Sequence, residues 1–285
     1  MVSEAAAQIA HGLAPAVLGA TDPLSHVIDG HLDFGEALHP LTDALYSIGL
    51  TKQVFMFLLA GVLTLLFFWS YARKAGQQRV PSRWGNFVES LITFLRDQMT
   101  RPFMGEHGDR YVPVIASFFV YILICNLLGL IPFFDYIGHG GNTATGNICI
   151  TAGLAICAFC FYHYNGIKEQ GSLWTYIKNL FPHVPLPILP VIVVVEIVAH
   201  IVRPFALAVR LFANMFAGHT MMAVILGFTT VFTEDFFVPG GAISLVCFLS
   251  VTALMFLELL VAVIQAFVFS FLTTVFLAGA VHPEH

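Results

Sequence analysis

Residues 241–281 read GAISLVCFLSVTALMFLELLVAVIQAFVFSFLTTVFLAGAV and contain one charged side chain, that of Glu258. An uncharged run of about 18 residues is already enough for a helix to cross the roughly 30 Å hydrocarbon core of a bilayer. As a helix, this segment would be on the order of 60 Å long, about twice the hydrocarbon thickness. We predict a membrane helix that tilts strongly, breaks or protrudes into water, and its length alone does not choose among these.

A second long apolar segment, residues 187–232, precedes the first. Its polar interruptions are Glu196, His200, Arg203, Arg210, Asn214 and His219. Pro204 lies inside this segment, where a proline can kink a helix. The residues between the two segments, 233–240, are acidic at their start and contain Pro239, as is typical of a turn. The two segments therefore predict a long helical hairpin.

Three shorter apolar runs precede the hairpin and are each long enough to cross the membrane once. The sequence thus predicts an all-α integral membrane protein with about five membrane helices. We expect residues 1–50 to form a segment on the outer face and residues 51–285 to form the membrane domain. The expected spans lie near 54–71, 111–134, 147–164, 187–232 and 241–281. Between the first two spans, apolar residues from Trp84 to Met99 fall near one helical face and predict an amphipathic surface helix.

The composition supports a membrane protein and excludes other classes. Hydrophobic residues make up 58% of the 285 residues and charged residues 10%, whereas soluble domains carry about 25% charged residues. The net charge of −5 offers no basic surface for phosphate backbones, so nucleic acid is excluded as a partner. The five cysteines lie in apolar stretches and are interpreted as small apolar fillers, not as a disulfide framework or a zinc site.

The distribution of basic residues predicts the orientation of the chain. Seven of the twelve Lys and Arg residues lie between the first two spans, and Lys168 and Lys178 follow the third. Residues 1–50 contain neither Lys nor Arg. Because cytoplasmic loops are enriched in these residues, we expect the N-terminus outside and the C-terminus in the cytoplasm. Residues 1–20 lack the basic and apolar parts of a signal peptide, so we expect them to belong to the mature chain.

The polar residues of the hairpin recur at helical spacing. Steps of four and three residues separate Glu196, His200, Arg203, Leu207, Arg210, Asn214 and Ala217. This spacing puts the polar members on one stripe of a helix, with His219 near its outer end. On the last helix, Glu258 and Gln265 are seven residues apart and also share a face. Because ionisable groups in a membrane are costly and usually face a protein interior or an aqueous cavity, the two stripes predict a proton or ion path.

The chemistry of these side chains suggests a role for each. Arginine keeps its charge when buried, so Arg210 can act as a fixed positive barrier or attract a carboxylate, but it cannot pass a proton on. Glu258 and His219 can both gain and lose protons and form a candidate relay. Asn214 and Gln265 do not titrate near neutral pH, so they can only orient water and neighbouring groups.

Structural interpretations compete with these roles. Arg210 can be a structural arginine paired inside a bundle, and Glu196 and Arg203 can neutralise each other across two turns. His219 alone can be a structural histidine, and Asn126 in the second span is expected to bond a neighbouring helix. The histidines of the outer N-terminal segment, His26, His31 and His39, are interpreted as surface histidines. We expect no metal and no cofactor.

Other function classes find little support. The sequence contains no HExxH, GxSxG or P-loop pattern, so a membrane protease, hydrolase or NTPase would lack its active-site parts. A secondary transporter would also carry buried charges, but no inverted repeat is evident. A purely structural membrane scaffold is the third alternative, and it predicts that loss of the Glu258 carboxylate leaves ion transport intact.

Four stretches closely resemble subunit a of F-type ATP synthases. The most specific is RPFALAVRLFANMFAGH at residues 203–219. NLLGLIP at 126–132, DPLSHVIDG at 22–30 and ELLVAVIQAFVFSFLTTVFLAG at 258–279 extend the resemblance, in order, over most of the chain from about residue 22. The resemblance implies that the two long helices lie steeply tilted in the membrane and wrap a ring of c subunits.

The resemblance also implies roles for the site residues. Arg210 matches the stator arginine that faces the proton-carrying carboxylates of the c-ring and separates two aqueous half-channels, and Asn214 and Gln265 match its polar neighbours. His219 and Glu258 match a proton-handling pair that some members carry in the opposite order, with the acid first. Glu196 matches an acidic position of the cytoplasmic half-channel.

The implied function is that of the proton-translocating stator subunit of the Fo sector, which couples proton flow to rotation and ATP synthesis and is not itself catalytic. The implied partners are the c-ring, the peripheral stalk subunit b and the lipid bilayer, and the implied ion is H⁺. The choice between H⁺ and Na⁺ is set largely by the c-ring, a different chain. We expect the inner (plasma) membrane of a bacterium in preference to an organelle membrane. An acid that the family sometimes carries after the outer linker is absent, because residues 142–150 read NTATGNICI.

Overall fold

The structure, a computed structural model, describes residues 51–75, 83–131, 144–180, 189–235 and 240–281. Within these ranges the chain is helical with short turns and has no strand, which confirms the predicted all-α class. Five of the described helices are long and apolar enough to cross a membrane, as expected of a multi-pass membrane protein. The predicted outer segment 1–50, with its histidines, lies outside the described residues.

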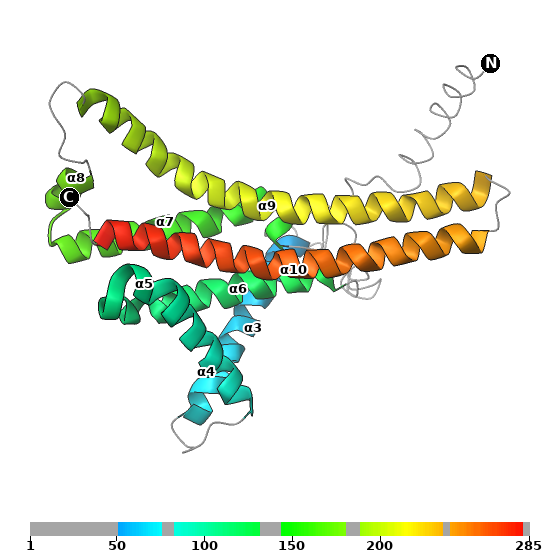
Figure 1. The fold of residues 1–285 in the computed structure, drawn as a ribbon, viewed down its shortest axis with the longest axis horizontal. Helices are drawn as coiled ribbons and strands as arrows, with labels where there is room; N and C mark the ends of the chain where they lie inside the picture. The colour runs from blue at the N-terminus through cyan, green and yellow to red at the C-terminus, as the bar shows by residue number, and fades with distance from the viewer. Residues whose placement is uncertain (1–50, 76–82, 132–143, 181–188, 236–239, 282–285) are drawn as a thin grey trace. The chain divides into compact units, whose positions relative to one another are not determined.

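The five long helices follow the predicted apolar runs (Figure 1). They are α3 (Lys52–Ala75), α6 (Val112–Leu130), α7 (Ile148–Gln170), α9 (Leu189–Asp235) and α10 (Gly240–Val281). Helix α7 continues beyond the predicted end of its run and stops before Gly171, whose φ of 76° lies in the left-handed region that ends many helices. Residues 132–134 of the second predicted run lie outside the described part of the chain.

The last two helices form the predicted C-terminal hairpin. Helix α9 has 47 residues and α10 has 42, so each is about 60 to 70 Å long. Pro204 lies inside α9 without ending it. A proline has no backbone N–H, so the carbonyl of His200 one turn earlier loses its usual helical partner.

The predicted amphipathic helix is α4 (Arg83–Leu95). It buries Val88 and Leu95 and exposes the rings of Trp84 and Phe87. The indole Nε1 of Trp84 donates a hydrogen bond to the Ser70 hydroxyl of α3 at 3.0 Å. An exposed aromatic ring with a polar end is typical of a helix that lies at the membrane surface.

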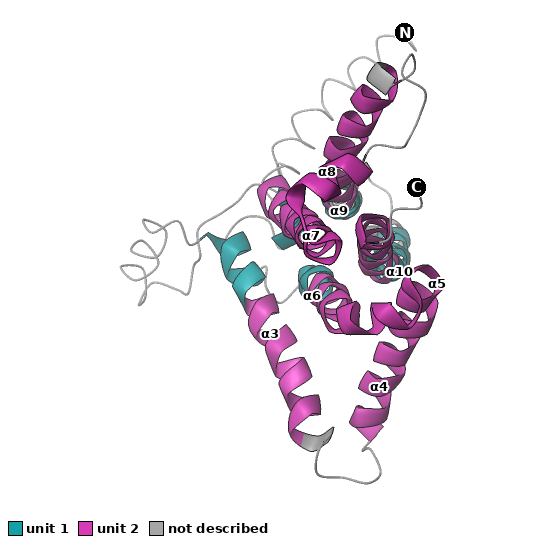
Figure 2. Cartoon of the chain, turned by 90° about the vertical axis from the view of Figure 1, so that its left-hand side faces the viewer, with its two compact units in different colours: residues 1–58, 125–147, 212–262 teal, residues 59–124, 148–211, 263–285 magenta. Residues whose placement is uncertain are grey.

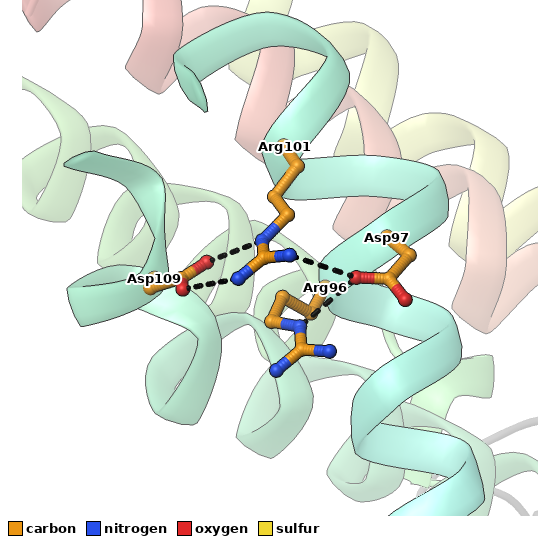
Figure 3. A network of polar contacts seen from close by, with 4 residues as sticks. All are labelled: Arg96, Asp97, Arg101 and Asp109. Atoms are coloured by element: carbon orange, nitrogen blue, oxygen red, sulfur yellow. Dashed lines mark hydrogen bonds and ion pairs between the residues drawn. The ribbon is translucent and has the colours of Figure 1, made fainter. Parts of the chain in front are cut away.

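After α4 the chain turns through a short π-helical segment (Arg96–Thr100), α5 (Arg101–Met104) and a 3₁₀ helix (Gly105–Tyr111). Figure 3 shows the charged network around this turn. The Arg101 guanidinium donates to both carboxylate oxygens of Asp109, at 3.1 and 2.8 Å. Arg96 donates to Asp97 at 2.9 Å. Because these groups are partly or fully exposed, the network orients the turn more than it stabilises the fold.

The chain divides into two compact units, which Figure 2 distinguishes by colour. Unit 1 comprises residues 1–58, 125–147 and 212–262, and unit 2 comprises residues 59–124, 148–211 and 263–285. Helices α3, α6, α9 and α10 each contribute to both units.

In unit 1 a buried asparagine links separate parts of the chain. The Asn126 amide nitrogen donates to the carbonyl oxygen of Ala262 in α10 at 3.3 Å, and its amide oxygen accepts a hydrogen bond from Thr145 at 3.0 Å. Asn126 and Thr145 are both fully buried. The prediction that Asn126 bonds a neighbouring helix is therefore confirmed, and the bonds satisfy polar groups that would otherwise be costly inside the fold.

In unit 2 a glycine allows three helices to meet. Gly166 of α7 lies against Tyr176 of α8 (Leu173–Leu180) and against the end of α10 at Ala280. Beside it, Gln170 donates to the Ala280 carbonyl at 2.9 Å and accepts a hydrogen bond from Asn179 at 3.1 Å. A side chain at position 166 would separate these helices.

We expect Gly166→Ala to destabilise the chain by about 1 to 3 kcal/mol, the usual cost of an overpacked contact. The added methyl carbon would lie 2.7 Å from Cε2 of Tyr176 and 2.9 Å from the Ala280 carbonyl oxygen. The measurement is the temperature at which the membrane-embedded chain loses resistance to a protease. Gly153→Ala is the matched control on the same helix, because a Cβ there meets no atom within 4 Å. If the two variants lose protease resistance at the same temperature, the predicted crowding at position 166 is wrong.

The cysteines correct one expectation. All five are free thiols, and Cys125 is buried, as a small apolar filler should be. Cys149, Cys157 and Cys160 of α7 are instead exposed, so they do not fill gaps between helices. Their position in an apolar run could not reveal this, because a helix that is apolar on every side gives no signal of which face is buried.

Candidate functional site

The first part of the polar stripe lies on α9 within unit 2. Oε1 of Glu196 lies 3.4 Å from Nη2 of Arg203 and 3.4 Å from Nδ1 of His200. The His200 Nδ1 also lies 2.9 Å from the backbone oxygen of Glu196. The Arg203 guanidinium lies 5.3 Å from the centre of the Phe276 ring in α10. The acid predicted for one half-channel thus sits between a permanent cation and a titratable imidazole.

Arg210 has a different environment from the other charged residues of the stripe. Its side chain is exposed, and it makes no hydrogen bond or ion pair with any residue that the structure describes. Its neighbours Leu207 and Leu211 are 2% and 0% exposed. The predicted stripe therefore contains both buried and exposed positions, because Leu207, which belongs to the same helical spacing as Arg210, is buried.

Two further site residues predicted from the sequence, Asn214 and Gln265, are less exposed than Arg210. Asn214 is half-buried on α9 in unit 1, and Gln265 is 3% exposed on α10 in unit 2. Amide groups at such positions need hydrogen-bond partners, which is the role predicted for them.

His219 and Glu258 face each other within unit 1. Nε2 of His219 lies 3.7 Å from Oε1 of Glu258, which is ion-pair distance when the imidazole is protonated. The Glu258 side chain is 6% exposed, and neither of its carboxylate oxygens has a hydrogen-bond partner among the described residues. A buried carboxylate with unused acceptors is costly when ionised, so it favours the approach of a proton, a water molecule or a cation.

Gly218 makes room for this carboxylate. A Cβ at position 218 would lie 2.5 Å from Oε1 and 2.8 Å from Cδ of Glu258. The atoms that it would meet belong to the end of a flexible side chain, so the helices can stay in place while the carboxylate moves.

We therefore expect Gly218→Ala to leave the chain in the membrane but to lower its ion transport severalfold, because the Glu258 carboxylate is displaced from His219. The measurement is ATP-driven acidification of membrane vesicles, with the amount of the chain determined on the same vesicles. Gly153→Ala again serves as the control, since its new methyl group meets nothing. Wild-type transport by Gly218→Ala would mean that the position of the carboxylate is unimportant.

Two polar residues near Glu196 were not predicted. His163 of α7 and Tyr176 of α8 are hydrogen-bonded to each other, and the His163 ring centre lies 5.5 Å from that of His200. The sequence could have indicated His163 as a candidate, because it is an ionisable residue inside an apolar run. Tyr176 gave none, because α8 is a short helix in a polar linker.

No group of three or more His, Cys, Asp or Glu side chains that could hold a metal ion occurs among the described residues. The N-terminal histidines lie outside that part of the chain.

Comparison with known proteins identifies the family. The sequence profile described as ATP synthase A chain matches residues 54–278, which is most of the chain. The chain belongs to the ATP synthase A chain family. The ATP synthase subunit a of Myxococcus xanthus is 35% identical over 257 residues, which cover 89% of this chain and 80% of the relative. That of Maricaulis maris is 33% identical over 243 residues, or 84% of this chain and 91% of the relative. That of Sphingopyxis alaskensis is 36% identical over 235 residues, or 81% and 87%.

Membership of the ATP synthase A chain family confirms the resemblance stated from the sequence. The matched region contains every residue that the sequence proposed for the site, from Glu196 to Gln265.

Proposed function

We propose that this chain is the proton-translocating stator subunit of the Fo sector of an ATP synthase. The observation that carries the proposal is the exposed Arg210, which lies within an apolar helix and has no ion-pair partner among the described residues. Exposure of a permanent charge to lipid is costly, so this side chain needs a polar or charged neighbour from another subunit or an aqueous cavity. A carboxylate on a ring of c subunits meets that need.

The proposed proton route has two halves. A proton enters from the outside near His219 and Glu258, which lie within ion-pair distance of each other. It passes to a c-ring carboxylate, travels with the turning ring, and leaves towards the cytoplasm near Glu196. Arg210 blocks direct passage between the halves because its guanidinium does not release its proton. Asn214 and Gln265 orient water and side chains beside it.

In this proposal the chain performs no catalysis itself. It works with the c-ring, the peripheral stalk subunit b and the surrounding lipid, and proton flow through it drives rotation and ATP synthesis. The names of the three relatives given above, each an ATP synthase subunit a of a bacterium, support a bacterial inner (plasma) membrane. The basic linkers support an N-terminus outside and a C-terminus in the cytoplasm. If α9 and α10 are steeply tilted in the membrane, α9 is long enough to lie along the surface of the c-ring.

Site-specific photo-crosslinking in intact membranes tests the predicted contact with the c-ring. In a variant without the five native cysteines, Ala206→Cys carries a thiol-reactive photo-crosslinker one turn from Arg210, on an exposed position of α9. We expect a covalent product with subunit c, identified by mass spectrometry. Ala208→Cys is the matched control, because Ala208 is buried. If Ala206→Cys is labelled but gives no product with subunit c, the proposed rotor interface is wrong.

A further inference from the structure

A second group of titratable side chains lies beside Glu196 in unit 2, and the proposed route does not use it. It consists of His200 on α9, His163 on α7 and Tyr176 on α8. Three separate helices contribute these residues, so the group is a product of tertiary packing and not of one helical repeat.

The geometry connects the group from one end to the other. His200 Nδ1 lies 3.4 Å from Oε1 of Glu196. The ring centres of His200 and His163 are 5.5 Å apart, so the two imidazoles are neighbours. The Nδ1 of His163 is hydrogen-bonded to the Tyr176 hydroxyl. The Nε2 of His163 is buried and has no hydrogen-bond partner among the described residues, so it is available to exchange a proton with a neighbouring group.

The Tyr176 end of the group lies in the linker after α7. This linker carries Lys168 and Lys178, which predict that it lies on the cytoplasmic side. Tyr176 is 4% exposed, and burial raises the pKa of its hydroxyl to about 12. The hydroxyl therefore keeps its proton near neutral pH, and it can act as donor and acceptor at once.

We propose that His200, His163 and Tyr176 continue the inner half-channel from Glu196 to the cytoplasmic linker and carry protons along it. The proposal rests on the function proposed above and adds three residues to it. A purely structural role, in which the hydroxyl of Tyr176 only holds α8 against α7, is the competing explanation.

The proton balance of the route is simple. Nδ1 of His200 carries a proton, because it donates to the backbone oxygen of Glu196 at 2.9 Å. In the uptake direction, water gives a proton to the oxygen of Tyr176, whose own hydroxyl proton passes to Nδ1 of His163. His163 releases its Nε2 proton to Nε2 of His200, which then gives its Nδ1 proton to the Glu196 carboxylate, and release to the cytoplasm is the reverse of these steps. One proton enters and one leaves, and each imidazole returns to its first tautomer by ring rotation or by exchange with water. Only Glu196 changes its charge in this sequence, and its next proton exchange with the c-ring side of the route restores it.

Passive proton conduction through the Fo sector tests the proposal. Membrane vesicles that contain the assembled complex are stripped of the ATP-hydrolysing sector, and a potassium diffusion potential drives protons through the membrane. Tyr176→Phe removes one hydroxyl and keeps the ring that packs on Gly166. Tyr162→Phe is the matched control, because the Tyr162 hydroxyl is also buried, lies on the residue next to His163, and has no hydrogen-bond partner among the described residues.

We expect Tyr176→Phe and His163→Gln to lower conduction about tenfold or more, the scale on which positioned proton-transfer groups act, and Tyr162→Phe to leave it unchanged. Imidazole added to the buffer should restore part of the conduction of His163→Ala, which a structural role would not explain. Wild-type conduction by both Tyr176→Phe and His163→Gln, with the complex assembled, overturns the proposal.

The same membranes before stripping, assayed for ATP-driven pumping, separate this result from a failure of the proposed function. If Arg210→Ala abolishes pumping while Tyr176→Phe and His163→Gln conduct normally, only the extension of the half-channel is wrong. If Arg210→Ala pumps normally, the stator function is wrong whatever the other variants do.

Discussion

Replacement of Arg210 by alanine is expected to lower ATP-driven proton pumping at least about a hundredfold, the scale on which the loss of one preorganised charge acts. The reason is the position of the guanidinium, which is exposed on α9 and makes no ion pair within the described chain. Nothing inside the described chain depends on it for neutralisation. The measurement is acidification of inverted membrane vesicles on addition of ATP, with the amounts of this chain and of subunit c determined on the same membranes.

A matched variant separates the role of this charge from a general need for arginine. Arg96 is also partly exposed, but it lies in the basic linker, where it pairs with Asp97. Arg96→Ala should therefore assemble and pump normally. Passive conduction adds a second readout, because a channel that has lost its barrier still leaks protons when it can no longer pump. Wild-type pumping by Arg210→Ala in an assembled complex would remove the central assignment and favour a secondary transporter, which should then purify in active form without a c-ring.

The membrane helices could be predicted from the sequence because each is an uncharged apolar run, and hydrocarbon leaves a chain few alternatives to a helix. The pairing of His219 with Glu258 was also within reach once the hairpin was accepted. In an antiparallel hairpin, residues at similar distances from the connection face each other, and these two lie on either side of the residues that join α9 to α10.

The environment of each polar residue could not be predicted in the same way. Helical spacing placed Leu207 and Arg210 on one stripe, but one is buried and the other exposed. The difference depends on which neighbouring helix covers that side of α9, and spacing within one helix contains no information about its neighbours. The contact between His163 and Tyr176 was missed for the same reason, because it joins α7 to a short helix with no apolar run.

Replacement of Glu258 by glutamine is expected to abolish pumping while the complex still assembles. Glutamine has nearly the shape of glutamate, so packing against Gly218 and His219 is kept, but its amide cannot take up and release a proton near neutral pH. Glu258 is the more informative member of the pair because both of its carboxylate oxygens lack hydrogen-bond partners among the described residues. A structural acid would be expected to accept hydrogen bonds with both oxygens, since a buried carboxylate without hydrogen bonds destabilises the fold.

The control for this variant is Glu89→Gln, which changes an exposed acid on α4 and should pump like the wild type. Assembly is checked by co-purification of subunits b and c with each variant. Pumping by Glu258→Gln at the wild-type rate would mean that the carboxylate serves only the fold, as in a membrane scaffold. Loss of pumping in an assembled complex would instead mean that transport requires the Glu258 carboxylate to take up and release a proton, because the substitution removes a titratable group and little else.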